Sequence, residues 1–546
     1  MSEVKDVPLE IVVEKKLLHF PVKEGAKKRL VTVAADGVPV RRFDIELAER
    51  DDADWWAPLD VSAWPGKRLS VAADKLPVGS KALDSLQQSD TLFDSENLYR
   101  EALRPQLHFS AQRGWINDPN GLAFFNSEYH LFYQHNPYGW GWGNMHWGHA
   151  TSCDLIHWQE HGEALYPDEL GAMFSGSAVV DRNNTSGFGR DGKPPLVLIY
   201  TAAGSRGGQC IASSTDGRTF TKYDQNPVIR NFVNGNRDPK VFWHEPTKKW
   251  VMVLYGEPES PGGELTKEGK PAAQHGVYFF TSPNLRDWTF TSTAKGGIGD
   301  DTFLYECPDF FELPVDGDPS NKKWILTGAN ADYAIGAFDG TKFTPETQKV
   351  HGYSGRGFYA AQTFSDTPDG RRIQIGWLQS PSPGMPFNQA MSLPVELKLR
   401  ITPEGPRLAR QPVKELESLR NEPSQSGALE NFRGDLIELS AEFEPGDTGT
   451  VEFNFRGAKI ACDAKKEEII VNGMRGFAPL VDGQQHIRMF ADRTILEVFA
   501  SDGLTYMPVP FIADHKDQSV SVEVKGENAK MTSLQVYKLK SIWKGE

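Results

Sequence analysis

At residues 115–121 the chain reads Trp115-Ile116-Asn117-Asp118-Pro119-Asn120-Gly121. Its one carboxylate, Asp118, stands directly before a proline. Proline cannot donate a ladder hydrogen bond, and its ring disfavours a helical conformation at the preceding residue, so we expect Asp118 to be extended at the mouth of a strand. Taken alone, the stretch is more typical of a turn, because Asn, Asp, Pro and Gly are the usual turn residues. Its recurrence downstream favours the strand.

Short, strongly apolar segments recur five times in the middle of the chain, at 130–134, 196–200, 250–255, 324–328 and 373–377. From Leu131 to Leu196, Trp250, Trp324 and Ile373 the steps are 65, 54, 74 and 49 residues. A loose period of this size, built from strands, is typical of a β-propeller with one four-stranded sheet per blade. We therefore predict a five-bladed β-propeller over residues 103–402.

Two further markers run in phase with these segments. A polar turn before an aromatic residue, which we expect to join the outer strands of a blade, occurs at 154–158, 216–220, 284–288 and 339–343. A second marker precedes each apolar segment and by position begins the innermost strand of its blade, at 117–119, 174–176, 237–239, 306–308 and 358–360. Three of these starts carry a carboxylate followed by proline, directly or one residue later: Asp118, Asp238 and Glu306. Because inner strands converge on the propeller axis, we expect the three acids to face one another in one funnel.

Three converging acids have several possible uses. Like charges repel, so at least one pKa should be raised, and carboxyls whose pKa values are pushed apart suit glycoside hydrolysis. A Ca²⁺ site is the alternative, disfavoured because Arg237, next to Asp238, would act as the counter-ion. A third interpretation, acids that merely cap turns, conflicts with their repeated placement. Nearby neutral polar and flat aromatic side chains favour a sugar ligand: Asn117, Gln134, Ser175, Trp142, Phe174 and Trp377.

Period-two alternation continues on both sides of the predicted propeller. The prediction is an all-β chain, with a small N-terminal β-sandwich-like domain and linker over 1–100, a connector over 403–428 and a C-terminal β-sandwich over 429–546. In the first domain Trp55, Trp56 and Trp64 are expected to pack in the core, with a sugar platform as the alternative. The C-terminal sandwich is expected to support the propeller or to mediate a dimer.

Composition excludes several classes of protein. The net charge is −14, with no block of Lys and Arg to follow a phosphate backbone, so nucleic acid is not an expected partner. No apolar run reaches the roughly 18 residues of a membrane span, and the chain begins without a signal peptide. Four scattered cysteines lack metal-site or disulfide spacing. Histidines 146, 149, 157 and 161 invite a metal interpretation, but we expect structural roles for them.

Four of the quoted motifs together resemble those of glycoside hydrolase family 32, which includes invertases, inulinases and levanases. They are Trp115 to Gly121, Phe174-Ser175-Gly176-Ser177, Arg237-Asp238-Pro239 and Glu306-Cys307, in the same order. The resemblance covers about residues 103 to 546. It implies a five-bladed propeller followed by a C-terminal β-sandwich.

The resemblance also implies roles for single residues. Asp118 corresponds to the nucleophile, Asp238 to the transition-state stabiliser and Glu306 to the general acid/base, kept protonated by nearby negative charge. The positions that shape the fructose pocket correspond to Asn117, Gln134, Trp142, Phe174, Ser175, Arg237 and Trp377. Cys307 is either a small buried filler or a residue that tunes Glu306. No cofactor and no metal are implied.

The resulting hypothesis is a retaining exo-β-fructosidase that removes terminal fructose from levan, inulin or sucrose through a covalent fructosyl-enzyme. Its rivals are a fructosyltransferase with the same site, a non-catalytic sugar-binding propeller and an inverting arabinan-type hydrolase. A polymeric substrate favours an extracellular or periplasmic location, although the chain carries no export signal.

Overall fold

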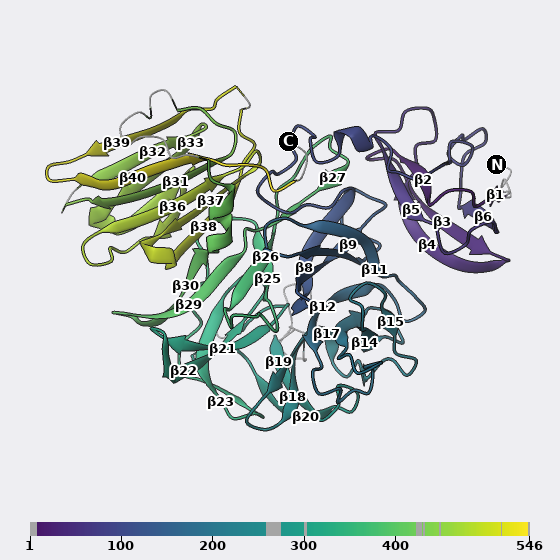
Figure 1. Cartoon of the computed structure of the whole chain (residues 1–546), viewed down its shortest axis with the longest axis horizontal. Coiled ribbons are helices and arrows are strands. Elements are labelled where there is room, and N and C mark those ends of the chain that lie inside the picture. The colour runs from purple at the N-terminus through teal and green to yellow at the C-terminus, as the bar shows by residue number, and fades with distance from the viewer. Residues whose placement is uncertain are drawn as a thin grey trace, which may run out of the picture.

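Strands make up nearly all of the regular structure in the computed structural model, which describes residues 8–257, 275–299, 303–421, 429, 432–446, 449–514 and 516–543. An N-terminal β domain lies on one side of a central propeller, and a β-sandwich lies on the other (Figure 1). The predicted all-β architecture is confirmed.

The described residues of the central region form five blades around one axis. The first blade contains β8 (Gly114–Phe125), β9 (Glu128–Asn136), β10 (His146–Ser152) and β11 (Gln159–Leu165). The second contains β12 (Met173–Val180), β13 (Leu196–Ala202), β14 (Gly208–Ser214), β15 (Thr221–Lys222) and β16 (Ile229–Arg230). The third contains β17 (Asn234–His244), β18 (Lys249–Glu257), β19 (Gly276–Ser282) and β20 (Thr289–Ala294).

The fourth blade contains β21 (Asp309–Val315), β22 (Asp318–Thr327), β23 (Tyr333–Phe338) and β24 (Phe343–Pro345). The fifth contains β25 (Phe358–Thr363), β26 (Ile373–Leu378), β29 (Val395–Thr402) and β30 (Gly405–Pro412), with β28 (Ala390–Met391) beside β26. The short strand β27 (Phe387–Asn388) pairs in parallel with β8 and so joins the last blade to the first.

The predicted apolar segments are the second strands of the blades, β9, β13, β18, β22 and β26. Strand β13 is buried along its whole length, as expected for a strand covered by neighbouring blades on both faces. The four predicted polar turns lie between the third and fourth strands of the first four blades. The predicted positions of the apolar segments and of the polar turns are thus confirmed.

The segment 403–428, which we expected to be a connector, begins with β30. Strand β30 pairs along its length with β29, with Thr402 opposite Gly405. Gly405 adopts a φ of +97°, which favours glycine and lets the chain reverse tightly. The Pro403-Glu404 pair is therefore a hairpin turn inside the fifth blade rather than the start of a linker. The expected short helix follows as a 3₁₀-helix, η2 (Lys414–Leu419).

The N-terminal domain is built from two small sheets. One has the order β1 (Leu9–Val12), β6 (Arg68–Ala73), β3 (Lys28–Ala35), β4 (Val38–Glu46), and the other the order β5 (Trp55–Asp60), β2 (Leu17–Val22), β7 (Gln87–Ser89). Trp55 is buried in the core between them, as predicted. The polar residues that end the predicted domain and linker over 1–100 are not a plain linker, because they include β7 and a 3₁₀-helix, η1 (Ser95–Asn97).

The C-terminal sandwich packs two sheets of the described residues face to face. One has the order β38 (Thr505–Pro510), β37 (Ile495–Ala500), β36 (Gln485–Ala491), β31 (Ile437–Glu444), β40 (Lys530–Lys538). The other has the order β35 (Met474–Phe477), β34 (Glu468–Val471), β33 (Ala458–Asp463), β32 (Thr450–Phe455), β39 (Val520–Lys525). Two 3₁₀-helices, η4 (Ala464–Lys466) and η5 (Ser501–Gly503), lie in its turns.

A single apolar core extends from the propeller into the sandwich. It joins Ile116 and Phe311 of the blades to Phe490 and Phe499 of the sandwich. Inside it, His108 contacts Asp492 through Nδ1 at 2.8 Å and Glu497 through Nε2 at 2.9 Å, and all three side chains are fully buried. Burial alone would lower the pKa of His108, but its hydrogen bonds to the two carboxylates raise it to about 9.

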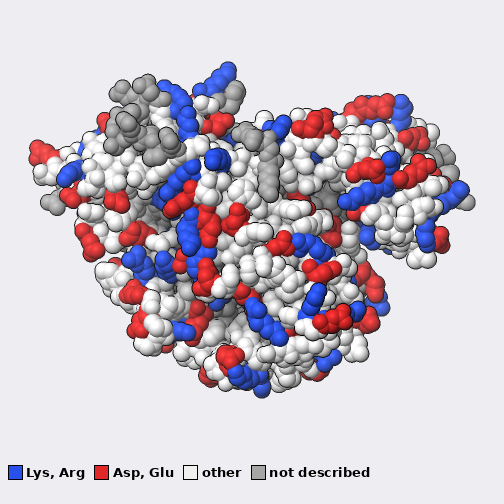
Figure 2. Space-filling view, viewed as in Figure 1, with Lys and Arg blue, Asp and Glu red and all other residues white. Residues whose placement is uncertain are grey.

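The surface carries both signs of charge. On the face shown in Figure 2, Lys and Arg are interspersed with Asp and Glu over all three regions. This mixture gives that face no continuous basic track of the kind that follows a phosphate backbone. Among the residues that the structure describes, no helix is long and apolar enough to span a membrane.

Candidate active site

The three acids lie at or just before the start of the inner strands of their blades, and the strand pairing is irregular at the two aspartates. The register of β8 shifts between Ile116 and Pro119, on either side of Asp118. The register of β17 shifts between Arg237 and Lys240, on either side of Asp238. A β-bulge leaves residues unpaired and redirects their side chains. The irregular pairing therefore lets these carboxylates leave the sheet and face the axis.

Left-handed backbone conformations accompany the second and third acids. Asp238 has a φ of +64°, Glu306 of +47° and Cys307 of +39°. Side-chain-bearing residues rarely adopt this region, and they do so mostly where the surrounding structure enforces it for function. Glu306 and Cys307 are separated from the start of β21 by Pro308 alone, so the chain turns sharply as it approaches the inner strand of the fourth blade.

Asp118 is held by a chain of hydrogen bonds from neighbouring side chains. Ser175 Oγ donates to its Oδ2 at 2.6 Å, and Asn117 Nδ2 donates to its Oδ1 at 3.0 Å. Trp115 Nε1 in turn donates to Asn117 Oδ1 at 3.0 Å. Both carboxylate oxygens thus have a donor, which fixes the side chain in one orientation.

Cys307 links two of the acids. Its backbone N–H donates to Asp238 Oδ2 at 3.0 Å, and its Sγ lies 3.4 Å from Asp238 Oδ2 and 3.5 Å from Asp118 Oδ2. Burial raises the pKa of this thiol well above its usual value, and the neighbouring carboxylates add to the effect. Cys307 is therefore a neutral thiol that bridges Asp118 and Asp238, a contact that neither sequence interpretation named.

Glu306 is held from two sides. Arg237 Nη2 donates to its Oε1 at 2.7 Å, and the Tyr359 hydroxyl donates to its Oε2 at 2.6 Å. The same guanidinium lies 3.0 Å from Glu257 Oε1 and 3.8 Å from Asp238 Oδ2. Arg237 is therefore the cation shared by these carboxylates, in the counter-ion position expected from the sequence.

Two of the acids have raised pKa values. Burial raises the pKa of Asp118, and the charge of Glu306 raises it further. The hydrogen bonds donated by Ser175 and Asn117 oppose this increase. Burial also raises the pKa of Asp238 to about 7, which Arg237 opposes and Asp118 reinforces. The sequence predicted a raised pKa from mutual repulsion, but removal from water is the larger cause.

The aromatic residues predicted to line the pocket lie around this cluster. The rings of Trp142 and Phe174 meet edge to face with centroids 6.0 Å apart. Trp377 meets Trp115 at 5.8 Å and Tyr359 at 6.1 Å, both nearly edge to face. Gln134, the remaining predicted residue, is buried, and its Nε2 donates to the carbonyl of Met173 at 2.8 Å. Gln134 thus ties the first blade to the strand that carries Phe174 and Ser175.

Sequence reasoning missed Tyr359 as a residue of this site. It stands at the start of β25, where the register shifts between Tyr359 and Gln362 as it does at the acids. The signal was present, because the fifth inner-strand marker, 358–360, includes this residue. It was overlooked because that marker contains no carboxylate.

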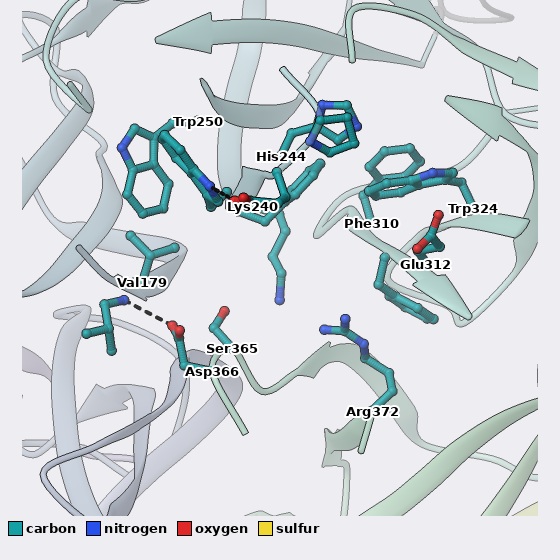
Figure 3. Close-up of a pocket in the computed structure, with 16 residues that line it drawn as sticks. Val179, Lys240, His244, Trp250, Phe310, Glu312, Trp324, Ser365, Asp366 and Arg372 are labelled. Atoms are coloured by element: carbon teal, nitrogen blue, oxygen red, sulfur yellow. Dashed lines mark hydrogen bonds between the residues drawn. The ribbon is translucent and has the colours of Figure 1, made fainter. Parts of the chain in front are cut away.

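A separate cavity of about 350 Å³ lies at the opposite ends of the inner strands (Figure 3). Lys240 and Arg372 point into it, between aromatic walls that include Trp250 and Trp324. Lys240 forms a buried ion pair with Asp309 at 3.0 Å, and its Nζ donates to the carbonyl of Thr363. None of the three acids lines this cavity, so it is not the site predicted from the sequence.

The clustered histidines are bound by protein groups. His149 Nε2 lies 3.0 Å from His130 Nδ1, and His146 Nδ1 contacts the carbonyl of Asn144. Within the described ranges, no group of three or more His, Cys, Asp or Glu side chains is arranged to hold a metal ion.

The pKa of Asp238 leads to a prediction about stability. In the folded protein this pKa is about 7, against an ordinary value of 3.8. The ionised form therefore destabilises the fold above pH 7, by an upper limit of roughly 4 kcal/mol, and this destabilisation is relieved as the pH falls from 7 towards 4. We expect Asp238→Asn to raise the free energy of unfolding at pH 8, with a smaller gain at pH 5.

Denaturant titrations of the parent protein and the variant at both pH values measure this difference. Asp36→Asn is a matched control, because Asp36 is an exposed aspartate far from the funnel, and it should shift stability little at either pH. An equal gain from Asp238→Asn at pH 8 and pH 5 would contradict the raised pKa.

Comparisons with known proteins agree on one family. Residues 108–412 match the sequence model described as "Glycosyl hydrolases family 32 N-terminal domain", and residues 407–538 match "Glycosyl hydrolases family 32 C terminal". A levanase of Bacillus subtilis (strain 168) is 39% identical over 503 residues, covering 82% of this chain and 72% of the relative. An invertase of Wickerhamomyces anomalus is 38% identical over 403 residues, covering 65% of this chain and 70% of the relative.

Among solved structures, an exo-inulinase from Aspergillus awamori superposes with a TM-score of 0.69 at 29% identity. The match covers 82% of this chain and 100% of that chain. The family models leave residues 1–107 unmatched, which is the region of the N-terminal β domain.

Proposed function

This chain belongs to glycosyl hydrolases family 32, and from that premise we propose that it is a retaining exo-β-fructosidase. Its substrates are fructans of the levan and inulin type and sucrose, from which it releases terminal β-D-fructofuranosyl units. The names of the relatives support this substrate range, since they include a levanase, exo-inulinases and an invertase. It is a glycoside hydrolase.

The observation that carries the proposal is the meeting of Asp118, Asp238 and Glu306 around Cys307 and Arg237. The Cys307 thiol lies within 3.5 Å of both aspartates, and Arg237 contacts Glu306 at 2.7 Å. Glycoside hydrolysis with retention requires one carboxylate as the nucleophile and a second carboxyl group as the acid/base. We assign these roles to Asp118 and Glu306.

In the first step a carboxylate oxygen of Asp118 attacks the anomeric carbon of the terminal fructose. The bond from that carbon to the leaving oxygen breaks, and Glu306 gives its proton to this oxygen. In the second step Glu306 takes a proton from water, the water oxygen attacks the same carbon, and the ester bond to Asp118 breaks. Two inversions at one carbon release fructose with its original configuration.

Asp238 stabilises the charge that develops on the ring. Its carboxyl is fixed by the Cys307 N–H and by the bulge in β17, so it needs no rearrangement when positive charge appears on the sugar. Hydrogen bonds from sugar hydroxyls to a fixed carboxylate strengthen as that charge grows. The pocket around the ring is shaped by Asn117, Gln134, Ser175, Arg237, Phe174 and Trp377, and Trp142 stands at its rim.

An assay of fructose release from levan, inulin and sucrose, run side by side, tests the proposal. We expect free fructose as the main product from all three, with the β-anomer appearing first when the reaction is followed by NMR. Oligosaccharides longer than the substrate would instead identify a fructosyltransferase. First release of the α-anomer would contradict the covalent ester.

We further propose that the enzyme acts outside the cytoplasm. A polymeric substrate supports this location, as does the name of an Aspergillus niger relative, an extracellular exo-inulinase that is 32% identical over 540 residues. Detecting the enzyme in culture medium or periplasmic extract tests the location.

A further inference from the structure

The N-terminal β domain meets the rest of the chain at the loop that carries Trp142. This loop spans residues 137–145 and joins β9 to β10 in the first blade. Trp142 is 57% exposed, and its ring meets that of Phe174 edge to face. Phe174 is the residue before Ser175, which hydrogen-bonds Asp118. Trp142 therefore stands at the rim of the funnel, beyond the acids.

One end of the loop is anchored in the core of the N-terminal domain. Tyr138 is 1% exposed and belongs to that core rather than to the core of the blades. Its ring stacks on Phe43 of β4, with centroids 3.7 Å apart and planes 16° from parallel. An aromatic side chain buried in this way strongly restrains the backbone next to it.

The other end of the loop is bound to the edge of a strand. Strand β4 is the last strand of its sheet, so the outer backbone groups of Asp44 have no strand partner there. The Asn144 side chain takes the place of a strand partner. Its Oδ1 accepts a hydrogen bond from the Asp44 N–H at 2.9 Å, and its Nδ2 donates one to the Asp44 carbonyl at 2.7 Å. The amide thus occupies the edge of β4 as a neighbouring strand would.

Contacts within the propeller hold the middle of the loop. Asn136 Nδ2 donates to the carbonyl of Gly141 at 2.7 Å, and Asn388 Nδ2 donates to the carbonyl of Trp140 at 2.9 Å. Trp142 is thus attached to both bodies, and loss of the attachment at Asn144 should loosen the rim without unfolding the blade.

We propose that the N-terminal β domain positions Trp142 through Tyr138 and Asn144, and thereby sets the affinity for fructan units that extend beyond the fructosyl pocket. The proposal rests on the fructosidase function proposed above. It gives a role to a domain that lies outside the family match, with Tyr138 and Asn144 acting through Trp142 rather than on the reacting atoms.

The test compares Asn144→Ala with the matched control Asp44→Ala. The control keeps the docking contacts, because Asp44 binds Asn144 through backbone atoms and its own side chain is exposed. Hydrogen–deuterium exchange of peptides covering 137–145 measures positioning directly, without any assay of activity. We expect exchange roughly tenfold faster in Asn144→Ala, because three side-chain hydrogen bonds are lost, two to Asp44 and one to Asn136 Oδ1. We expect no change in Asp44→Ala.

Kinetics then measure the consequence for substrate. We expect Asn144→Ala to raise KM for inulin and levan by about three- to tenfold, with kcat within about twofold of the parent, because the lost contact serves binding. In a Trp142→Ala background, Asn144→Ala should add no further change in KM. Independent effects that multiply would overturn the proposal, and so would unchanged exchange in Asn144→Ala.

The two proposals fail in different ways. A parent enzyme that releases no fructose from levan, inulin or sucrose contradicts the proposed function, while the exchange experiment still decides whether the N-terminal domain holds the loop. Faster exchange with unchanged KM for both polymers would overturn the claim that the loop sets affinity.

Discussion

Replacement of Asp118 by alanine is expected to lower kcat for fructose release by a factor of at least about 10⁴, since loss of a nucleophile removes the covalent route. The carboxylate is fixed by donors on both oxygens, from Ser175 at 2.6 Å and Asn117 at 3.0 Å, so no neighbouring acid can take its place in the same geometry. Steady-state assays on sucrose and inulin measure the loss. Turnover within tenfold of the parent would contradict the assignment.

The fold should tolerate this substitution. Burial raises the pKa of Asp118, so the ionised side chain opposes folding at neutral pH, and its removal should not lower the melting temperature. Ser175→Ala is the matched comparison, because it keeps the carboxylate but removes one donor. We expect it to lower kcat by about 10- to 100-fold, as loss of one hydrogen bond to a charged group weakens orientation without ending the chemistry. Equal losses in both variants would mean that Asp118 serves orientation and not attack.

Replacement of Glu306 by glutamine is expected to lower kcat by about 10² to 10⁴, the usual contribution of general acid–base catalysis. The amide oxygen of the glutamine can still accept a hydrogen bond from Arg237, so the site should keep its geometry. The fall in kcat then measures the missing proton transfer. A fructoside with a good leaving group needs no proton from Glu306 in the first step. Its rate of turnover should therefore fall much less in Glu306→Gln than that of sucrose. Parallel assays on sucrose and on fructosyl fluoride measure this difference.

The second step offers an independent check on Glu306. Azide needs no deprotonation, so it should attack the fructosyl ester in Glu306→Gln and restore turnover of fructosyl fluoride. Tyr359→Phe is the milder comparison, because it removes the donor to Oε2 but leaves the carboxyl group. Equal losses on sucrose and fructosyl fluoride in Glu306→Gln, with no rescue by azide, would mean that Glu306 is not the acid/base.

The sequence predicted the propeller and its acids because both repeat. The apolar second strands and the inner-strand starts occur in phase, and that phase places Asp118, Asp238 and Glu306 on one axis without any knowledge of contacts. The hairpin at Pro403-Glu404 was missed for a local reason. It reverses the chain through Gly405, and the same residues are equally common in linkers.

Other features depend on contacts that no local pattern encodes. The Cys307 bridge exists because Glu306 and Cys307 both adopt positive φ, which neither residue type predicts. The hydrogen bond between Asn144 and Asp44 joins positions 100 residues apart. Because it uses backbone atoms of Asp44, the residue type at position 44 does not indicate that Asn144 binds there. Such an interaction can be identified only from a structure that contains both the edge of β4 and the rim of the first blade.

The buried contacts of His108 with Asp492 and Glu497, and the apolar core around them, join the propeller and the sandwich through one continuous interface. A large apolar junction of this kind resists relative domain motion. The propeller and the sandwich are therefore expected to move as one body during turnover, which leaves any gating of the funnel to side chains and loops at its rim.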